Sequence, residues 1–200
     1  NGTVILTVPA NAAQDGTGNN NTASTSADNT VTYDTVRPTV TINQAAGQAD
    51  PTNASPINFT VVFSESVTGF TETDVVLTGT AGPTTAFVTG SGTTYNVAVS
   101  GMVTNGTVIA TVLVNAAVDA ANNSSFPSTS ADNTVTYDVT FPTVTIDQAA
   151  AQFDPTGASP INFTVVFSEP MTVASFTGAD VLLSGTALPT TAVVTGSGTT

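Results

Sequence analysis

The sequence repeats itself at a spacing of 104 residues. The run ASPINFTVVFSE at Ala54–Glu65 recurs letter for letter at Ala158–Glu169, and STSADNTVTYD at Ser24–Asp34 recurs at Ser128–Asp138. A period of this length exceeds the roughly 20–50 residues of a solenoid repeat and matches a domain that closes its own core. The chain is therefore predicted to consist of tandem domains, joined like beads on a string.

The positions of the copies predict three segments. These are the C-terminal part of one repeat (1–34), a complete repeat (38–138) and the N-terminal part of the next repeat (142–200). Val88–Thr94 returns at Val194–Thr200, offset by 106, so a two-residue insertion is expected near Val173. Because the opening residues NGTVILTV match the middle of a repeat, the chain is expected to be an excerpt of a longer protein.

Within the complete repeat, apolar and polar residues alternate in short runs that are separated by Gly, Pro, Asn, Asp and Ser. Ile57, Phe59, Val61 and Phe63 alternate with Asn and Thr, for example. A period of two with one polar face is typical of a half-buried antiparallel strand, and no window has a helical period. We expect an all-β fold of about seven antiparallel strands in an immunoglobulin-like sandwich. Its predicted core contains Phe59, Phe63, Val97, Val108, Val112 and Tyr137.

Composition excludes several kinds of function. The chain has 14 acidic residues against a single basic one, Arg37, which gives a net charge of −13. Nucleic-acid binding needs clustered Lys and Arg, so it is not expected. The chain lacks Cys, which excludes disulfides and thiolate sites, and no apolar run approaches the ~20 residues of a membrane span.

Catalysis is not expected either, and no catalytic residue is predicted. The absence of His, Lys and Cys removes the usual general bases and nucleophiles. Glu65 and Asp74 could form a carboxylate pair of the kind that glycosidases use. However, such a pair would recur in every repeat, and the sequence offers no aromatic platform for a sugar.

The run FSESVTGFTETDVVLTG, at Phe63–Gly79, is followed by a Gly-Thr-Val strand at Gly106–Val108 and by an Asp-led loop at Asp119. The first repeat has this loop as D-x-x-G-N from Asp15, whereas Asn122 replaces the glycine in the second. This pattern resembles the bacterial Ig-like repeats of large surface adhesins and other exported proteins. The resemblance implies the sandwich fold and an extracellular or cell-surface location in a bacterium. In the third repeat the loop after FSE is longer.

The acidic residues predict metal sites at the junctions between repeats. The loops at one pole of the sandwich should bring Glu65, Asp74 and Asp119 close to Asp34, where the linker leaves the preceding bead. The same reasoning groups Asp138, Glu169 and Asp180 at the next junction. Calcium takes six to eight oxygen ligands, so Ca²⁺ is the expected ion. The alternative is that these acids cap turns and solvate the surface.

The remaining expectations concern function and partners. The leading hypothesis is a structural spacer, the stalk of an adhesin or an extracellular filament. Alternatives are a carbohydrate- or protein-binding module, or a spacer attached to an exported enzyme. The expected partners are the neighbouring repeats and other copies in a filament or sheath. Arg37 has no basic counterpart at Phe141 in the next repeat, so it is expected only to pair loosely with Asp34.

Overall fold

The protein is described from a computed structural model covering residues 1–172 and 174–200. Val173, beside which the insertion is predicted, lies outside the described residues. Over the described residues the fold is all-β, with antiparallel sheets and two short 3₁₀ turns. The chain divides into two compact units, Asn1–Val139 and Thr140–Thr200. The finer division into three repeat segments stays a prediction.

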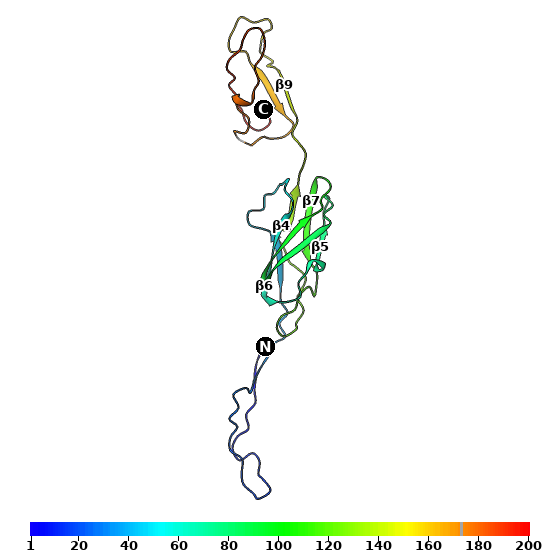
Figure 1. Ribbon diagram of the computed structural model, residues 1–200, viewed down its shortest axis with the longest axis vertical. Coiled ribbons are helices and arrows are strands. Elements are labelled where there is room, and N and C mark those ends of the chain that lie inside the picture. The colour runs from blue at the N-terminus through cyan, green and yellow to red at the C-terminus, as the bar shows by residue number, and fades with distance from the viewer. Residues whose placement is uncertain (173) are drawn as a thin grey trace. The chain divides into compact units, whose positions relative to one another are not determined.

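Residues 38–138, which we call the middle bead, contain two antiparallel sheets (Figure 1). One sheet has the order β3-β4-β6 and the other the order β5-β7-β8. Their bounds are Val40–Gln44 for β3, Ile57–Val67 for β4, Val75–Thr78 for β5, Thr85–Ser100 for β6, Gly106–Val112 for β7 and Thr134–Tyr137 for β8. The 3₁₀ turn η1 (Glu72–Asp74) leads into β5.

The alternation along β4 explains which side chains form the core. Ile57, Phe59 and Val61 are fully buried, whereas the intervening Asn58 and Thr60 are partly exposed. Val108, Ala110 and Val135, from the other sheet, belong to the same hydrophobic cluster. Two sheets that share one core are consistent with a β-sandwich. The predicted core is confirmed, with Tyr137 packed against it and partly buried.

Three aromatic rings lie where β4 ends. Phe63, Phe70 and Tyr95 are all buried, and each ring meets the other two edge to face at centroid distances of 5.2–5.8 Å. The Tyr95 hydroxyl donates a hydrogen bond to the Val67 carbonyl at 3.1 Å. These contacts hold the C-terminal end of β4, which carries Glu65, against β6.

The two flanking segments reproduce parts of the middle bead in the same register. The hairpin of β1 (Gly2–Ile5) and β2 (Thr30–Tyr33) pairs Gly2 with Tyr33, as Gly106 pairs with Tyr137. In the second unit, β9 (Val144–Gln148) and β10 (Phe163–Phe167) pair Val144 with Phe167, as Val40 pairs with Phe63. The repeated sequence therefore forms the same local structure in each copy.

Burial differs sharply between the copies. Val31 is 68% exposed, whereas its counterpart Val135 is fully buried. In the second unit Ile146 is 57% exposed, whereas its counterpart Ile42 is fully buried. The apolar faces of the strands are thus exposed to solvent in both flanking segments, whereas the equivalent faces are buried in the middle bead. Among the described residues, no helix has the length and hydrophobicity needed to cross a bilayer.

Replacing Phe59 with Ala tests the core. The ring is fully buried between the sheets, so the substitution should lower the free energy of unfolding by about 3–5 kcal/mol. Thr60→Ala is the matched control, because Thr60 is the next residue along β4 and is partly exposed; its cost should stay below about 1 kcal/mol. Urea unfolding measures both, and equal losses would contradict the assignment.

Candidate functional site

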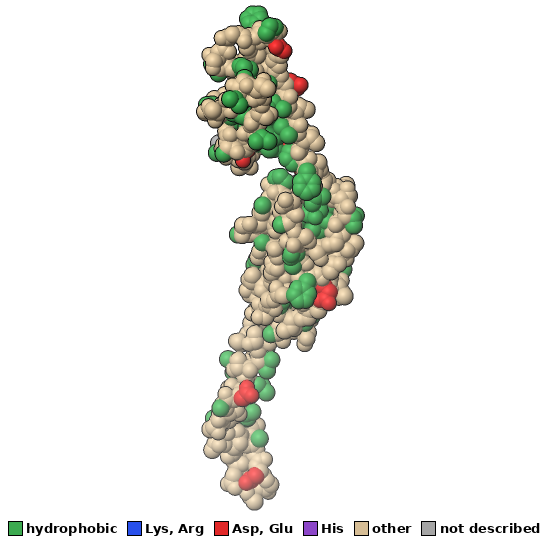
Figure 2. All heavy atoms as spheres, turned by 45° about the horizontal axis from the view of Figure 1, so that its top comes forward, with side chains coloured by type: hydrophobic (Ala, Val, Ile, Leu, Met, Phe, Trp, Pro, Cys, Tyr) green, Lys and Arg blue, Asp and Glu red, His purple; other side chains and the backbone are tan. Residues whose placement is uncertain are grey.

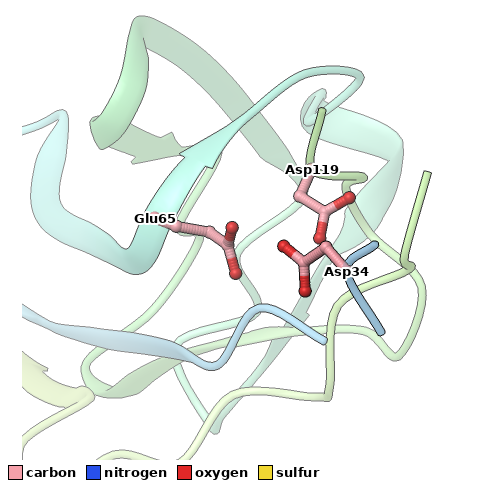
Figure 3. Close-up of side chains that lie close together, drawn as sticks. All are labelled: Asp34, Glu65 and Asp119. Carbon is pink, nitrogen blue, oxygen red and sulfur yellow. The ribbon is translucent and has the colours of Figure 1, made fainter. Parts of the chain in front are cut away.

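Three carboxylates from distant parts of the sequence converge in the first unit (Figure 3). Asp34, Glu65 and Asp119 each offer an oxygen, and these atoms all lie within 4.8 Å of one another. Asp119 is only 5% exposed, and the other two are partly exposed. The structure thus brings together three of the four acids that the sequence groups at this junction.

Asp119 is held by its own loop. Its Oδ1 accepts hydrogen bonds from the backbone N–H groups of Ala121 and Asn123, both at 2.8 Å. Its Oδ2 accepts one from the Asn123 side chain at 2.9 Å. Asn122 adopts a left-handed backbone, with φ of 64°, as Gly18 does at the equivalent position with φ of 88°, so the turn survives replacement of the glycine. Burial opposes ionisation of Asp119, but these hydrogen bonds outweigh it and lower the pKa.

The equivalent loop in the first segment has the same hydrogen bonds. Asp15 accepts from the backbone N–H groups of Thr17 and Asn19, both at 2.9 Å, and from the Asn19 side chain at 3.0 Å. The hydrogen bonds from Asn19 and Thr17 hold the pKa of Asp15 well below its usual range. Because Asp15 is exposed, the short D-x-x-x-N sequence alone determines this loop and the orientation of its carboxylate.

Glu65 stands at an inward position of β4, two residues beyond the buried Phe63 and two before the buried Val67. Removal of its carboxyl from water raises the pKa of Glu65, and the negative charges of Asp119 and Asp34 raise it further. The ionised side chain is therefore disfavoured by its surroundings, and a cation placed among the three carboxylates would relieve that cost.

Asp34 is positioned by the linker that enters the middle bead. Its Oδ1 accepts from the backbone N–H of Val36 at 2.9 Å and from the side chain of Asn1. Its carbonyl accepts from the Asn123 side chain at 3.3 Å, so one amide joins the Asp119 carboxylate to the backbone of Asp34. Sequence reasoning did not assign this bridging role to Asn123. The sequence sign of this role is that Asn123 follows the loop residue Asp119 by four positions, as Asn19 follows Asp15.

The predicted pairing of Arg37 with Asp34 is wrong for the part of the chain that the structure describes. The guanidinium instead donates to the carbonyls of Ser124 and Ser125, at 2.6 and 2.8 Å, and lies 4.3 Å from the centroid of the Phe126 ring. Carbonyl oxygens and an aromatic face hold a planar guanidinium well. Arg37 therefore fastens the linker to the middle bead.

Asp74 is not part of the group, because a local interaction occupies it. Its Oδ2 accepts from both the backbone N–H and the hydroxyl of Thr71, each at 2.9 Å, which caps η1. Asp180 caps η2 (Gly178–Asp180) in the same way through Thr177 at 2.8 Å, and these hydrogen bonds lower its pKa. Asp74 and Asp180 therefore cap turns, which is the alternative interpretation that the sequence left open for the acidic residues.

The second predicted group remains a prediction. Asp138 lies next to the last residue of the first unit and accepts a hydrogen bond from the Asn105 side chain, as Asp34 does from Asn1. Glu169 follows β10 in the second unit, as Glu65 follows Phe63 in β4. Asp138 and the pair of Glu169 and Asp180 thus belong to different units.

Three carboxylates supply charge and at least three oxygen ligands, the donor set that hard cations such as Ca²⁺ prefer. The remaining ligands of a six- to eight-coordinate ion would have to be water or nearby carbonyl oxygens.

Comparisons with protein-family models, with curated proteins and with solved structures gave no match for this chain. The resemblance to bacterial Ig-like repeats thus rests on the sequence motifs.

Replacing Glu65 with Gln tests the electrostatics of the group. Because the folded pKa is raised above the usual 4.5, folding loses stability as pH rises through that pKa, and the variant avoids this loss. Without divalent cations, Glu65→Gln should therefore melt at a higher temperature than the wild type near pH 7. The difference should vanish once the pH is below the unfolded value of 4.5.

Glu72→Gln is the matched control, because Glu72 lies on the exposed turn η1. The substitution removes the same negative charge, but at a position outside the group of three carboxylates. Its melting temperature should follow that of the wild type. Equal stabilisation by both variants would show that only net charge matters, and no gain from Glu65→Gln would show that the carboxylates do not repel one another.

Proposed function

We propose that the chain is part of a structural spacer, the stalk of a bacterial surface adhesin or of an extracellular filament, built from tandem Ig-like repeats. The observation that carries the proposal is the internal repetition. Long blocks recur unchanged, and each copy pairs its strands in the same register. A protein selected for reach can lengthen by copying one domain, whereas a specific binding tip is usually unique.

The middle bead supports this role because it has its own core. Its buried hydrophobic residues come from both of its sheets and form one cluster within residues 38–138. The linkers contain Pro38 and Pro142, which restrict the backbone and disfavour helix. In the first linker, Arg37 adds contacts to the loop that precedes β8. A bead with its own core and a restrained linker are what a spacer under mechanical force requires.

Calcium at the junction is a further part of the proposal. Asp34 is the last residue of the preceding segment, where the linker begins, whereas Glu65 and Asp119 belong to the middle bead, so an ion held by all three would fasten the start of the linker to the bead. The ion would also relieve the repulsion that raises the pKa of Glu65. Its expected effect is to stiffen the junction and to stabilise the folded state.

The spacer role predicts that beads unfold one at a time under force. In a single-molecule pulling experiment on several joined copies of residues 35–138, each step should release about 30–35 nm of contour length, as about 100 residues of extended chain require. Stepless extension, or steps that span several beads at once, would contradict independent folding.

The calcium proposal predicts a ligand-dependent melting temperature. At a hundredfold excess of Ca²⁺ over its Kd, binding to the folded state should add about 2.7 kcal/mol of stability. Addition of a chelator should reverse the gain. Glu65→Gln should reduce this response and Glu72→Gln should leave it unchanged. If the wild type does not respond at millimolar Ca²⁺, the acids form only a solvated surface.

A further inference from the structure

The middle bead covers two of its own sheet edges. Each of its sheets has two edge strands, β3 and β6 in one and β5 and β8 in the other. Along the outer edge of β3, the backbone N–H of Thr129 donates to the carbonyl of Val40 at 3.0 Å. Along the outer edge of β8, the backbone N–H of Thr52 donates to the carbonyl of Thr136 at 2.9 Å. Loops of the same chain therefore occupy the edges of β3 and β8.

The edge formed by β6 is different. β6 folds back on itself, since the N–H of Thr84 donates to the carbonyl of Ser100 at 3.1 Å and a Cβ added to Gly90 would lie 2.6 Å from the carbonyl oxygen of Thr94. The second half of β6 pairs with β4, and in the described part of the chain no other strand pairs with β6. Its first half, Thr85–Thr89, is thus the outermost part of the sheet, and we call it the open edge.

The open edge keeps one large apolar side chain in solvent. Ala86 and Val88 are partly buried and pack against the core, which holds this segment on the bead. Phe87, between them, is 63% exposed. An unpaired strand backbone with an exposed aromatic ring at its centre is a surface suited to pairing with another strand.

The sequence of the open edge is self-complementary. It reads Thr-Ala-Phe-Val-Thr, which is almost the same in both directions around Phe87. If two copies pair antiparallel with Phe87 opposite Phe87, the threonines face each other and Ala86 faces Val88. Thr–Thr and aromatic pairs stabilise antiparallel strands. The corresponding run in the next repeat, Thr191–Thr195, reads Thr-Ala-Val-Val-Thr and has the same symmetry.

The charge distribution also favours a second copy at this edge. The chain has a net charge of −13, so most contacts between two copies would bring carboxylates together. Residues 75–118, which form β5, β6 and β7, contain no charged residue. In Figure 2 the visible acidic side chains are few and widely separated. The open edge thus carries none of the charges with which natural sheets prevent edge-to-edge pairing.

We propose that the open edge pairs antiparallel with the open edge of a second copy of this chain, about a two-fold axis at Phe87, so that the two β3-β4-β6 sheets become continuous. Both copies contribute the same surface, so the contact closes as a dimer. A single edge buries little area and binds weakly, but edges on successive beads would act together. The contact belongs to the middle bead and depends on neither calcium nor the spacer role.

Opposite charges at residue 87 test whether Phe87 meets Phe87. In analytical ultracentrifugation of the full 200-residue chain at high salt, which screens the net charge, the wild type should dimerise as its concentration rises. Phe87→Asp and Phe87→Lys should each weaken dimerisation at least about tenfold, because like charges then meet at the two-fold axis. An equimolar mixture of the two variants should restore it.

The mixture separates pairing from folding, since a variant that lost dimerisation through misfolding would not be rescued by its partner. Phe87 is largely exposed, so both variants should fold. Val62→Asp is the matched control. Val62 is 43% exposed on β4, an inner strand of the same sheet, and the variant should dimerise as the wild type does.

Single cysteines test the direction of pairing, because the chain has no Cys of its own. Under mild oxidation, Phe87→Cys should form a disulfide-linked dimer. Thr85→Cys should cross-link with Thr89→Cys in a mixture and only weakly with itself, because antiparallel pairing places these two positions opposite each other. Val62→Cys should stay monomeric.

Four results would each overturn the paired edges. They are a wild type that is monomeric at every concentration, a mixture of the Phe87 variants that does not pair, a Thr85→Cys variant that cross-links with itself as readily as with Thr89→Cys, and Val62 variants that behave like those of Phe87.

Discussion

Each strand of the repeat has one apolar and one polar face, and a stable fold depends on covering the apolar face. In the middle bead, β3 and β4 cover β7 and β8, and Phe59 and Val135 both become fully inaccessible to water. The same strands occur in the flanking segments without their partner sheet, where the counterparts of these residues are 60% and 68% exposed. Burial of large apolar side chains contributes about 1.5–3 kcal/mol each, so closure of the two sheets is the main source of stability.

Local structure, in contrast, does not depend on that closure. The loop of Asp15 has the same hydrogen bonds as the loop of Asp119, although the first is exposed and the second buried. The caps of η1 and η2 likewise use the same Thr and Asp atoms. Short-range hydrogen bonds thus orient the carboxylates of Asp15 and Asp119 in the same way with and without tertiary packing around them. The acidic group lies where the linker meets the Asp119 loop.

Much of the fold could be predicted from the sequence because the relevant signals are periodic. Alternation along Ile57–Phe63 predicted the buried face of β4, and the repeated blocks predicted the equivalent registers. The core list was correct apart from Tyr137, which is only partly buried. β6 was harder to predict, since Thr85–Ser100 runs through Gly90 and Gly92, and glycine usually separates strands.

The candidate site could be predicted only in part. Counting strands from pole to pole placed Glu65, Asp119 and Asp34 near one another, as the structure does. The same counting also placed Asp74 in this group. Its carboxylate instead accepts a hydrogen bond from Thr71, three residues earlier in the chain. The spacing T-x-x-D was available as a sign of capping. The partners of Arg37 could not be predicted, because its carbonyl acceptors lie 87 and 88 residues away along the chain and carry no side-chain signal.

Amide hydrogen exchange tests most directly whether closure of the two sheets, and not local sequence, stabilises the repeat. The segments Ser24–Asp34 and Ser128–Asp138 are identical, so their amides have closely matched intrinsic exchange rates. In dilute protein, protection in β8 should exceed protection in β2 by at least about a thousandfold, as a global stability of about 5 kcal/mol or more allows. Equal protection of the two identical strands would contradict the account.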